Sequence, residues 1–204
     1  MARKMFREAI ETYKEAPPSA MLMNKIGIAY HQLADIGDAE RYYARAVKLD
    51  PMFSEAINNL GTIYYSRHSY RRAIAQYKKV LRIKPESAAT LANMASAYFA
   101  RKQYDLAQEK LDQALAIDPK VLENHGGVGA VVRDSSVIDR PTFFYTLAKS
   151  YAKRGLNEEA MNFIRKALEE GFKERAKFKE EPEFRELRKD PEFEKVMAIE
   201  PKVL

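Results

Sequence analysis

The histidines are the residues of this chain best suited to metal binding or proton transfer, but their placement favours neither. His31, His68 and His125 lie far apart in the sequence, whereas ligands of one metal usually recur within a few residues. Adjacent carboxylates such as Glu169 and Glu170 fall where a helix is expected to end. No phosphate-binding loop, dinucleotide fingerprint or nucleophile elbow occurs, and there is no cysteine. We therefore expect no enzyme activity, no metal and no cofactor.

Asparagines offer a different chemistry, because a side-chain amide both donates and accepts hydrogen bonds. Asn59 and Asn93 stand 34 residues apart, and Asn58 precedes the first of them. Such amides can bind the backbone of an extended peptide through two hydrogen bonds. The simpler alternative, that asparagine is merely tolerated on a polar helix face, stays open.

A period of 34 residues places these asparagines and organises most of the chain. Four segments align without internal gaps, beginning at Ala20, Ser54, Ala88 and Pro141. Position 8 of the segments is Gly27, Gly61, Ala95 and Ala148. Position 11 is Tyr30, Tyr64, Tyr98 and Tyr151. Position 20 is Ala39, Ala73, Ala107 and Ala160. Agreement of residue type and spacing in all four segments indicates a true repeat.

Each repeat is predicted to be two antiparallel helices, A and then B. Small residues at positions 8 and 20 suit a close approach of the two helices, where larger side chains would overpack. Pro51, Pro85 and Pro119 end helix B and turn the chain into the next unit. The expected helices are 20–34, 38–49, 54–67, 70–83, 88–101, 104–117, 142–154 and 157–170.

The pattern resembles the tetratricopeptide repeat, W-x2-L-G-x2-Y followed by A-x3-F and P. Met23, Ile57, Leu91 and Phe144 stand in place of the tryptophan. The resemblance implies an all-α, right-handed α-α superhelix that binds proteins rather than transforming substrates. The block from Leu147 to Met197 is similar to the C-terminal part of some bacterial tetratricopeptide proteins.

The repeat positions divide the chain into seven parts. Residues 1–19 are a leading half-repeat with helix B only, 20–53, 54–87, 88–121 and 141–174 are full repeats, 122–140 is an insertion, and 175–204 is a C-terminal cap and tail. For the first part we favour missing upstream residues over a natural cap. The insertion is either a linker or, as its valines favour, an ordered loop with an extended piece at 130–133. In the tail, Glu181-Pro182 and Asp190-Pro191 each predict the start of a short helix.

The resemblance also implies which residues line the concave groove, since helix A faces it. The candidate peptide-binding residues are Asn24, Lys25, His31, Asn58, Asn59, Thr62, Tyr65, Asn93, Ser96, Phe99, Tyr145 and Lys149. Asn59 and Asn93 are similar to the asparagine ladder of O-linked N-acetylglucosamine transferases. Of the residues that clamp chaperone C-termini in related proteins, only Asn59 is matched. An acidic chaperone peptide is therefore not the expected ligand.

Basic residues give an alternative function, because the net charge of +6 is concentrated in the second repeat. The candidate patch is Arg67, Arg71, Arg72, Lys78, Lys79 and Arg82. It is either a solvated helix face or a site for anions or nucleic acid. Tyr70 and Tyr77 fall at apolar helical spacing, so nucleic acid is not the favoured partner.

The remaining expectations concern partners and compartment. No apolar run is long enough for a membrane-spanning helix, and the charged start MARKMFREAIETYKE is no secretory signal. The compartment stays open between cytoplasm and periplasm. The main partner is expected to be a protein or peptide. Met5, Phe6, Ile10 and Tyr13 predict an apolar face on the first helix that could mediate self-association, and a self-assembling structural repeat is a third hypothesis.

Overall fold

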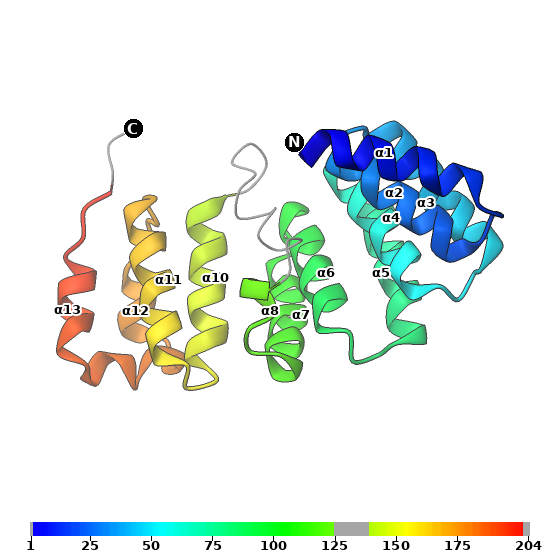
Figure 1. Cartoon of the computed structure of the whole chain (residues 1–204). Helices are drawn as coiled ribbons and strands as arrows, with labels where there is room; N and C mark the ends of the chain where they lie inside the picture. Colours follow the sequence, from blue (N-terminus) through cyan, green and yellow to red (C-terminus); the bar gives the residue numbers. More distant parts are fainter. Residues whose placement is uncertain (1, 125–138, 202–204) are drawn as a thin grey trace.

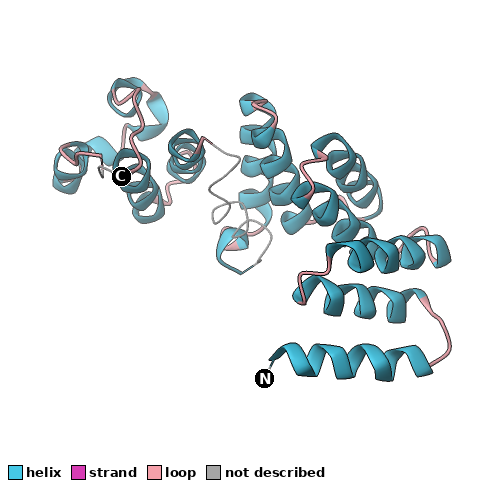
Figure 2. Cartoon of the chain, turned by 90° about the horizontal axis from the view of Figure 1, so that it is seen from above, coloured by secondary structure: helices cyan, strands magenta, loops and turns pink. Residues whose placement is uncertain are grey.

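Pairs of antiparallel helices follow one another along the chain and form a right-handed α-α superhelix (Figure 1). A computed structural model describes residues 2–124 and 139–201. Within those ranges there is no strand. The two ends of the array lie far apart. In the view from above, each helix pair is displaced from the preceding pair along the array (Figure 2). The extended piece expected at 130–133 lies outside the described residues.

Four helix pairs and a leading helix account for most of the array. The leading helix is α1 (Ala2–Glu15), and the pairs are α2 (Ala20–Gln32) with α3 (Ile36–Leu49), α4 (Ser54–Ser66) with α5 (Tyr70–Ile83), α6 (Ala88–Ala100) with α7 (Tyr104–Ile117), and α10 (Arg140–Ala152) with α11 (Asn157–Glu169). The short helix α8 (Val121–Asn124) follows α7. We call the two helices of a pair A and B. No described helix has the length and apolar character needed to cross a membrane.

Every helix A ends in the same left-handed turn. Position 15 of the repeats is Ala34, His68, Lys102 and Gly155, and the φ angles are 62°, 57°, 59° and 71°. The next residue donates its N–H to the carbonyl of position 11, as Ser69 does to Tyr64 at 2.8 Å. This is the hydrogen bond that closes a helix C-terminus around a left-handed residue. Only the fourth repeat uses glycine there, so the other three hold a side chain in a conformation that L-residues disfavour.

The contact between helices A and B joins positions 8 and 24. A Cβ built on Gly27 would lie 2.7 Å from the Tyr43 ring, and one on Gly61 would lie 2.6 Å from the Tyr77 ring. Both tyrosines are buried. In the third and fourth repeats, position 8 is alanine and position 24 is Leu111 or Ile164. The two repeats with a tyrosine at position 24 thus have glycine at position 8, and the two with a narrower aliphatic side chain at position 24 have alanine at position 8.

Helix α1 packs on α2 and buries much of its apolar face. Ile10 is buried, and Phe6 and Tyr13 pack against the cluster that contains it. Met5 remains 63% exposed. The apolar surface that this helix presents is therefore narrower than its sequence suggests.

The C-terminal cap closes the last pair with an aromatic cluster. Its elements are α12 (Ala176–Glu180), the 3₁₀ turns η1 (Pro182–Phe184) and η2 (Leu187–Lys189), and α13 (Pro191–Met197). Asp190 accepts a hydrogen bond from the Glu192 N–H at 2.8 Å and starts α13 as expected. The first Glu-Pro unit instead makes only a 3₁₀ turn. Glu181 provides no cap because its carboxylate contacts helix α10.

Helices α7 and α10 are joined by a network around one aspartate. Asp112 accepts hydrogen bonds from Ser150 Oγ and Lys153 Nζ, each at 2.7 Å. Its backbone carbonyl accepts one from Arg154 at 2.6 Å. Gln108 contacts both Asp112 and Ser150. Since Ser150 is buried, this network satisfies a polar group that would otherwise be costly to bury.

Candidate peptide-binding groove

A hollow of about 440 Å³ lies where the A helices of the first three repeats run side by side. It is lined by Asn24, Ile28, Ser54, Glu55, Asn58, Asn59, Val80, Lys84, Ser87, Ala89 and Thr90. Helices α2, α4 and α6 supply most of these residues, and the end of α5 supplies Val80. The lining is polar along α4 and has an apolar side chain, Ile28, that is 40% exposed.

Side-chain amides cross this hollow from one repeat to the next. Asn59 Nδ2 donates to Asn24 Oδ1 at 3.0 Å. Asn58 Oδ1 accepts from Thr90 Oγ1 at 3.1 Å and from Asn93 Nδ2 at 3.5 Å. Each of the two bonds between asparagines joins position 6 of one repeat to position 5 of the preceding repeat, so part of the bonding capacity of the asparagines holds the repeats together. Asn58 Nδ2 and Asn59 Oδ1 have no hydrogen-bond partner among the described residues.

The other groove candidates of the first two repeats are partly accessible. Lys25 is exposed, and its Nζ lies 5.9 Å from the centre of the Tyr13 ring. Burial lowers the pKa of His31 below its ordinary value of 6.5. Thr62 donates to the Asn58 carbonyl at 3.2 Å. Tyr65 packs on Tyr70 with ring centres 5.4 Å apart, beyond the edge of the hollow.

Two candidates of the third repeat lie in the core instead of the groove. Ser96 is buried, and its hydroxyl donates to the Ala92 carbonyl at 3.0 Å. Phe99 is buried between Tyr104 and Phe143, each with a ring centre 5.0 Å away. The expectation that Phe99 anchors a ligand is wrong for this structure, because α10 brings Phe143 over that position.

The candidates of the fourth repeat are covered by the cap. Tyr145 is buried, stacks on Phe172 at 4.7 Å, and donates its hydroxyl to Glu181 at 2.5 Å. Lys149 forms ion pairs with Glu181 at 3.1 Å and Glu183 at 3.5 Å. Burial first, and then the bond to Glu181, raise the pKa of the Tyr145 hydroxyl. The sequence placed Tyr145 and Lys149 in an open groove, and here the chain's own carboxylates occupy that place.

The six basic candidates of the second repeat have different surroundings. Arg67 pairs with Glu40 at 2.7 Å, and Arg72 lies over the Tyr64 ring at 5.9 Å. Arg71, in the first turn of α5, lines a pocket together with Arg72 and Arg101. Lys78 and Arg82, which are one turn apart on α5, line a hollow with Glu109. Lys79 is exposed. Arg101 was not among the predicted residues.

The described residues offer no cluster of histidine, aspartate or glutamate that could hold a metal ion. Glu55, the carboxylate that lines the candidate groove, pairs with Lys84 at 3.8 Å. The arrangement can therefore bind a ligand through amides, one apolar side chain and flanking charges.

Comparisons with known proteins agree with this architecture. Profiles described as tetratricopeptide repeat match residues 24–88, 64–124 and 141–170. Two crystal structures of MamA are similar: one has a TM-score of 0.57 and 22% identity over 87% of each chain, the other 0.54 and 20% over 80% of this chain and 85% of that one. At these identities the likeness concerns the fold. Comparison with curated proteins gives no significant match. The matched profiles cover most of the four helix pairs, and the chain belongs to the tetratricopeptide repeat family.

Proposed function

We propose that this chain is a non-enzymatic scaffold that binds an extended peptide of a partner protein across α2, α4 and α6. The observation that carries the proposal is the adjacent pair Asn58 and Asn59. One presents an amide N–H₂ and the other an amide carbonyl without a partner among the described residues. A peptide backbone offers the complementary acceptor and donor, so the pair can bind it without regard to side-chain sequence.

Fixed geometry supports this role. The bonds from Asn59 to Asn24 and from Asn93 to Asn58 hold both amides before any ligand arrives. A held amide loses little rotamer freedom when the peptide binds, which favours affinity. The family's solenoids offer concave surfaces of this kind to protein partners.

Side-chain selectivity would come from the rim of the hollow. Ile28 offers an apolar contact at one side. Glu55 with Lys84 adds a pair of opposite charges. We therefore expect peptides with an apolar residue beside the backbone segment that meets Asn58 and Asn59.

The test is a selection of linear peptides from a random display library on the purified chain. The groove variant is Ile28→Glu, which places a carboxylate where an apolar ligand side chain would be buried. The matched control is Leu106→Glu on α7, because Leu106 is 38% exposed and Ile28 is 40% exposed. Circular dichroism establishes that both variants remain helical.

Selected peptides should bind the Ile28→Glu variant at least about tenfold more weakly than the parent chain, a difference of about 1.4 kcal/mol. The Leu106→Glu variant should bind within about twofold of the parent. The groove would be refuted as the binding site if no peptide were enriched, or if both variants weakened peptide binding equally.

A further inference from the structure

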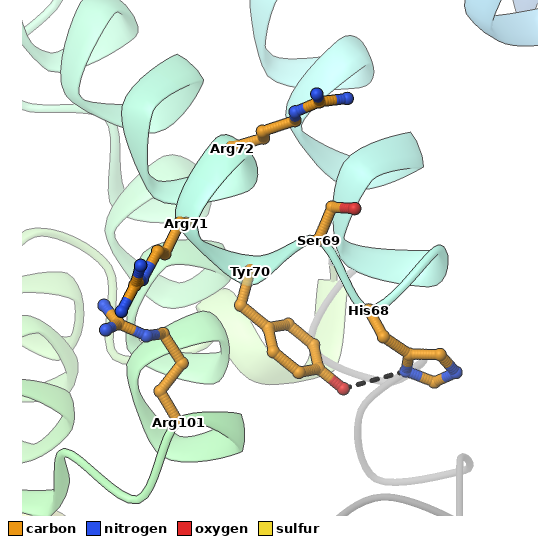
Figure 3. A pocket seen from close by; sticks show the side chains of 6 residues that line it. All are labelled: His68, Ser69, Tyr70, Arg71, Arg72 and Arg101. Atoms are coloured by element: carbon orange, nitrogen blue, oxygen red, sulfur yellow. Dashed lines mark hydrogen bonds between the residues drawn. The ribbon is translucent and has the colours of Figure 1, made fainter.

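A second pocket, of about 380 Å³, lies at the turn between α4 and α5, outside the groove. His68, Ser69, Tyr70, Arg71, Arg72 and Arg101 line it (Figure 3). The residues come from two successive repeats, because Arg101 directly follows α6. In the close-up, the guanidinium ends of Arg71 and Arg101 lie next to each other on one side of the Tyr70 ring. Arg72 points away from them, toward α4.

Arg101 differs from the arginines at the same position of the other repeats. Position 14 is Arg67 in the second repeat and Arg154 in the fourth. Arg67 pairs with Glu40 of the preceding helix B, and Arg154 bonds the Asp112 carbonyl of the preceding helix B. The residue equivalent to Glu40 in the helix before Arg101 is Ile74, which cannot form an ion pair. Among the described residues, Arg101 has no acidic partner.

Arg71 likewise has no acidic partner among the described residues. It lies in the first turn of α5, where a positive charge opposes the helix dipole. That turn contains no acidic residue, and Ser69 provides no side-chain cap for it. Two guanidinium groups beside an uncapped helix N-terminus repel one another unless an anion lies between them.

The other side of the pocket is formed by the side chains of His68 and Tyr70. His68 Nδ1 and Tyr70 Oη are hydrogen-bonded at 2.9 Å, and their rings meet edge to face with centres 5.9 Å apart. The left-handed φ of 57° at His68 places this imidazole beside the turn. The pocket thus has one side formed by the two guanidinium groups and another formed by the rings of His68 and Tyr70.

Nucleic acid fits these observations less well than a single small anion does. A backbone-binding surface needs cations in a continuous track along several phosphates. Here Arg67 is engaged with Glu40, and Arg72 is over Tyr64. At this pocket the charge left available is the pair Arg71 and Arg101, which suits bidentate contacts to one tetrahedral oxyanion.

We propose that Arg71 and Arg101 form a binding site for a single terminal phosphate group. The phosphate oxygens accept hydrogen bonds from the two guanidinium groups and from the first N–H groups of α5. This site is independent of the peptide groove, so either proposal can fail without the other.

The test is a titration of the isotopically labelled chain with inorganic phosphate, at constant ionic strength, followed by amide NMR. Saturable shifts are expected at Tyr70, Arg71 and Arg101. Arg71→Gln and Arg101→Gln should each weaken binding at least about tenfold. Arg82→Gln removes the same charge from the same helix α5 outside this pocket, and it should change binding less than about twofold. Should Arg101→Gln fold poorly, Arg71→Gln decides alone, because Arg71 is exposed.

Phosphoserine is the second probe and separates two sources of the same chemistry. Tighter binding than inorganic phosphate assigns the site to an organic phosphate monoester, and equal binding assigns it to phosphate itself. Shifts that rise linearly without saturation would overturn the proposal. Binding of a single-stranded DNA oligonucleotide is the last measurement. If Arg82→Gln and Arg101→Gln weakened that binding equally, the surface would bind through its overall positive charge, and the proposal would be overturned.

Discussion

Replacing Gly61 by alanine tests the packing of helices A and B most directly. An ideal Cβ at this position would lie 2.6 Å from Tyr77 Cε1, 3.0 Å from Cδ1 and 3.2 Å from Cζ. Ordinary contacts between such carbons begin near 3.5 Å, so the ring or the helix must move by about 1 Å. The Tyr77 side chain is only 1% exposed and has little room to retreat.

Two opposing effects set the magnitude. Alanine is better than glycine inside a helix by about 1 kcal/mol. Overpacking a buried contact costs about 1–3 kcal/mol. We therefore expect Gly61→Ala to lower the free energy of unfolding by about 1 kcal/mol. Urea denaturation followed by circular dichroism measures this change, and a lower melting temperature of about 2–4 °C should accompany it.

A second substitution and a matched control isolate the clash. In a Tyr77→Leu background, Gly61→Ala reproduces the Ala95 and Leu111 pair of the third repeat, so it should stabilise by up to about 1 kcal/mol. The coupling energy of the double-mutant cycle should then be about 2 kcal/mol. Gly37→Ala is the control, because the nearest atom to its Cβ is Asp35 Oδ1 at 3.9 Å. If Gly61→Ala stabilises the parent chain as Gly37→Ala does, the packing argument is refuted.

Four further outcomes follow from single residues. Ala34→Gly should stabilise by about 1 kcal/mol in urea denaturation, since Ala34 is held at a φ of 62°; an unchanged midpoint would count against strain there. Ala73→Leu should cost about 1–3 kcal/mol by the same assay because Ala73 is fully buried. Asp112→Ala should cost about 1–3 kcal/mol and speed hydrogen exchange in α10, because Ser150 loses its acceptor; unchanged exchange would contradict this. Burial lowers the pKa of His31, so the unfolded chain binds more protons below pH 6.5 and stability falls on acidification. His31→Gln should reduce that loss, measured as unfolding free energy between pH 7 and 5.

The helices could be predicted closely from sequence because their signals are local. The expected helix at 70–83 coincides with α5, and the prolines stand just beyond the ends of the B helices as expected. The A helices end a residue or two earlier than predicted, as α2 does at Gln32 instead of residue 34. The reason is the left-handed turn at position 15, which three of the repeats make without glycine. A side chain there gives no sequence signal for the end of the helix.

The candidate site was predictable only where neighbouring repeats are regular. Repeat positions correctly brought Asn24, Asn58, Asn59 and Asn93 together across three successive A helices. The same rule failed at Phe99, which α10 covers through Phe143. Position rules assume that the next repeat follows immediately, and here the insertion separates the third repeat from the fourth.

The arginine pair was missed for a different reason. The charge count singled out the second repeat, whereas Arg101 belongs to the third. Aligning position 14 would have found Arg67, Arg101 and Arg154 as equivalents. The sequence also has Ile74 at the repeat position that Glu40 occupies one repeat earlier. The lack of an acidic partner for Arg101 could therefore have been predicted from the sequence.

The cap determines how far a ligand could extend along the concave face. Tyr145 and Lys149 would be groove residues by their repeat positions, yet Glu181 and Glu183 engage them at 2.5–3.5 Å. These carboxylates belong to a segment whose Phe184 is fully buried, so releasing them would also expose an aromatic core. We expect a peptide to gain less from Lys149 than that exposure would cost. On the proposed function, binding is therefore concentrated on the first three repeats, where the amides of Asn58 and Asn59 remain accessible.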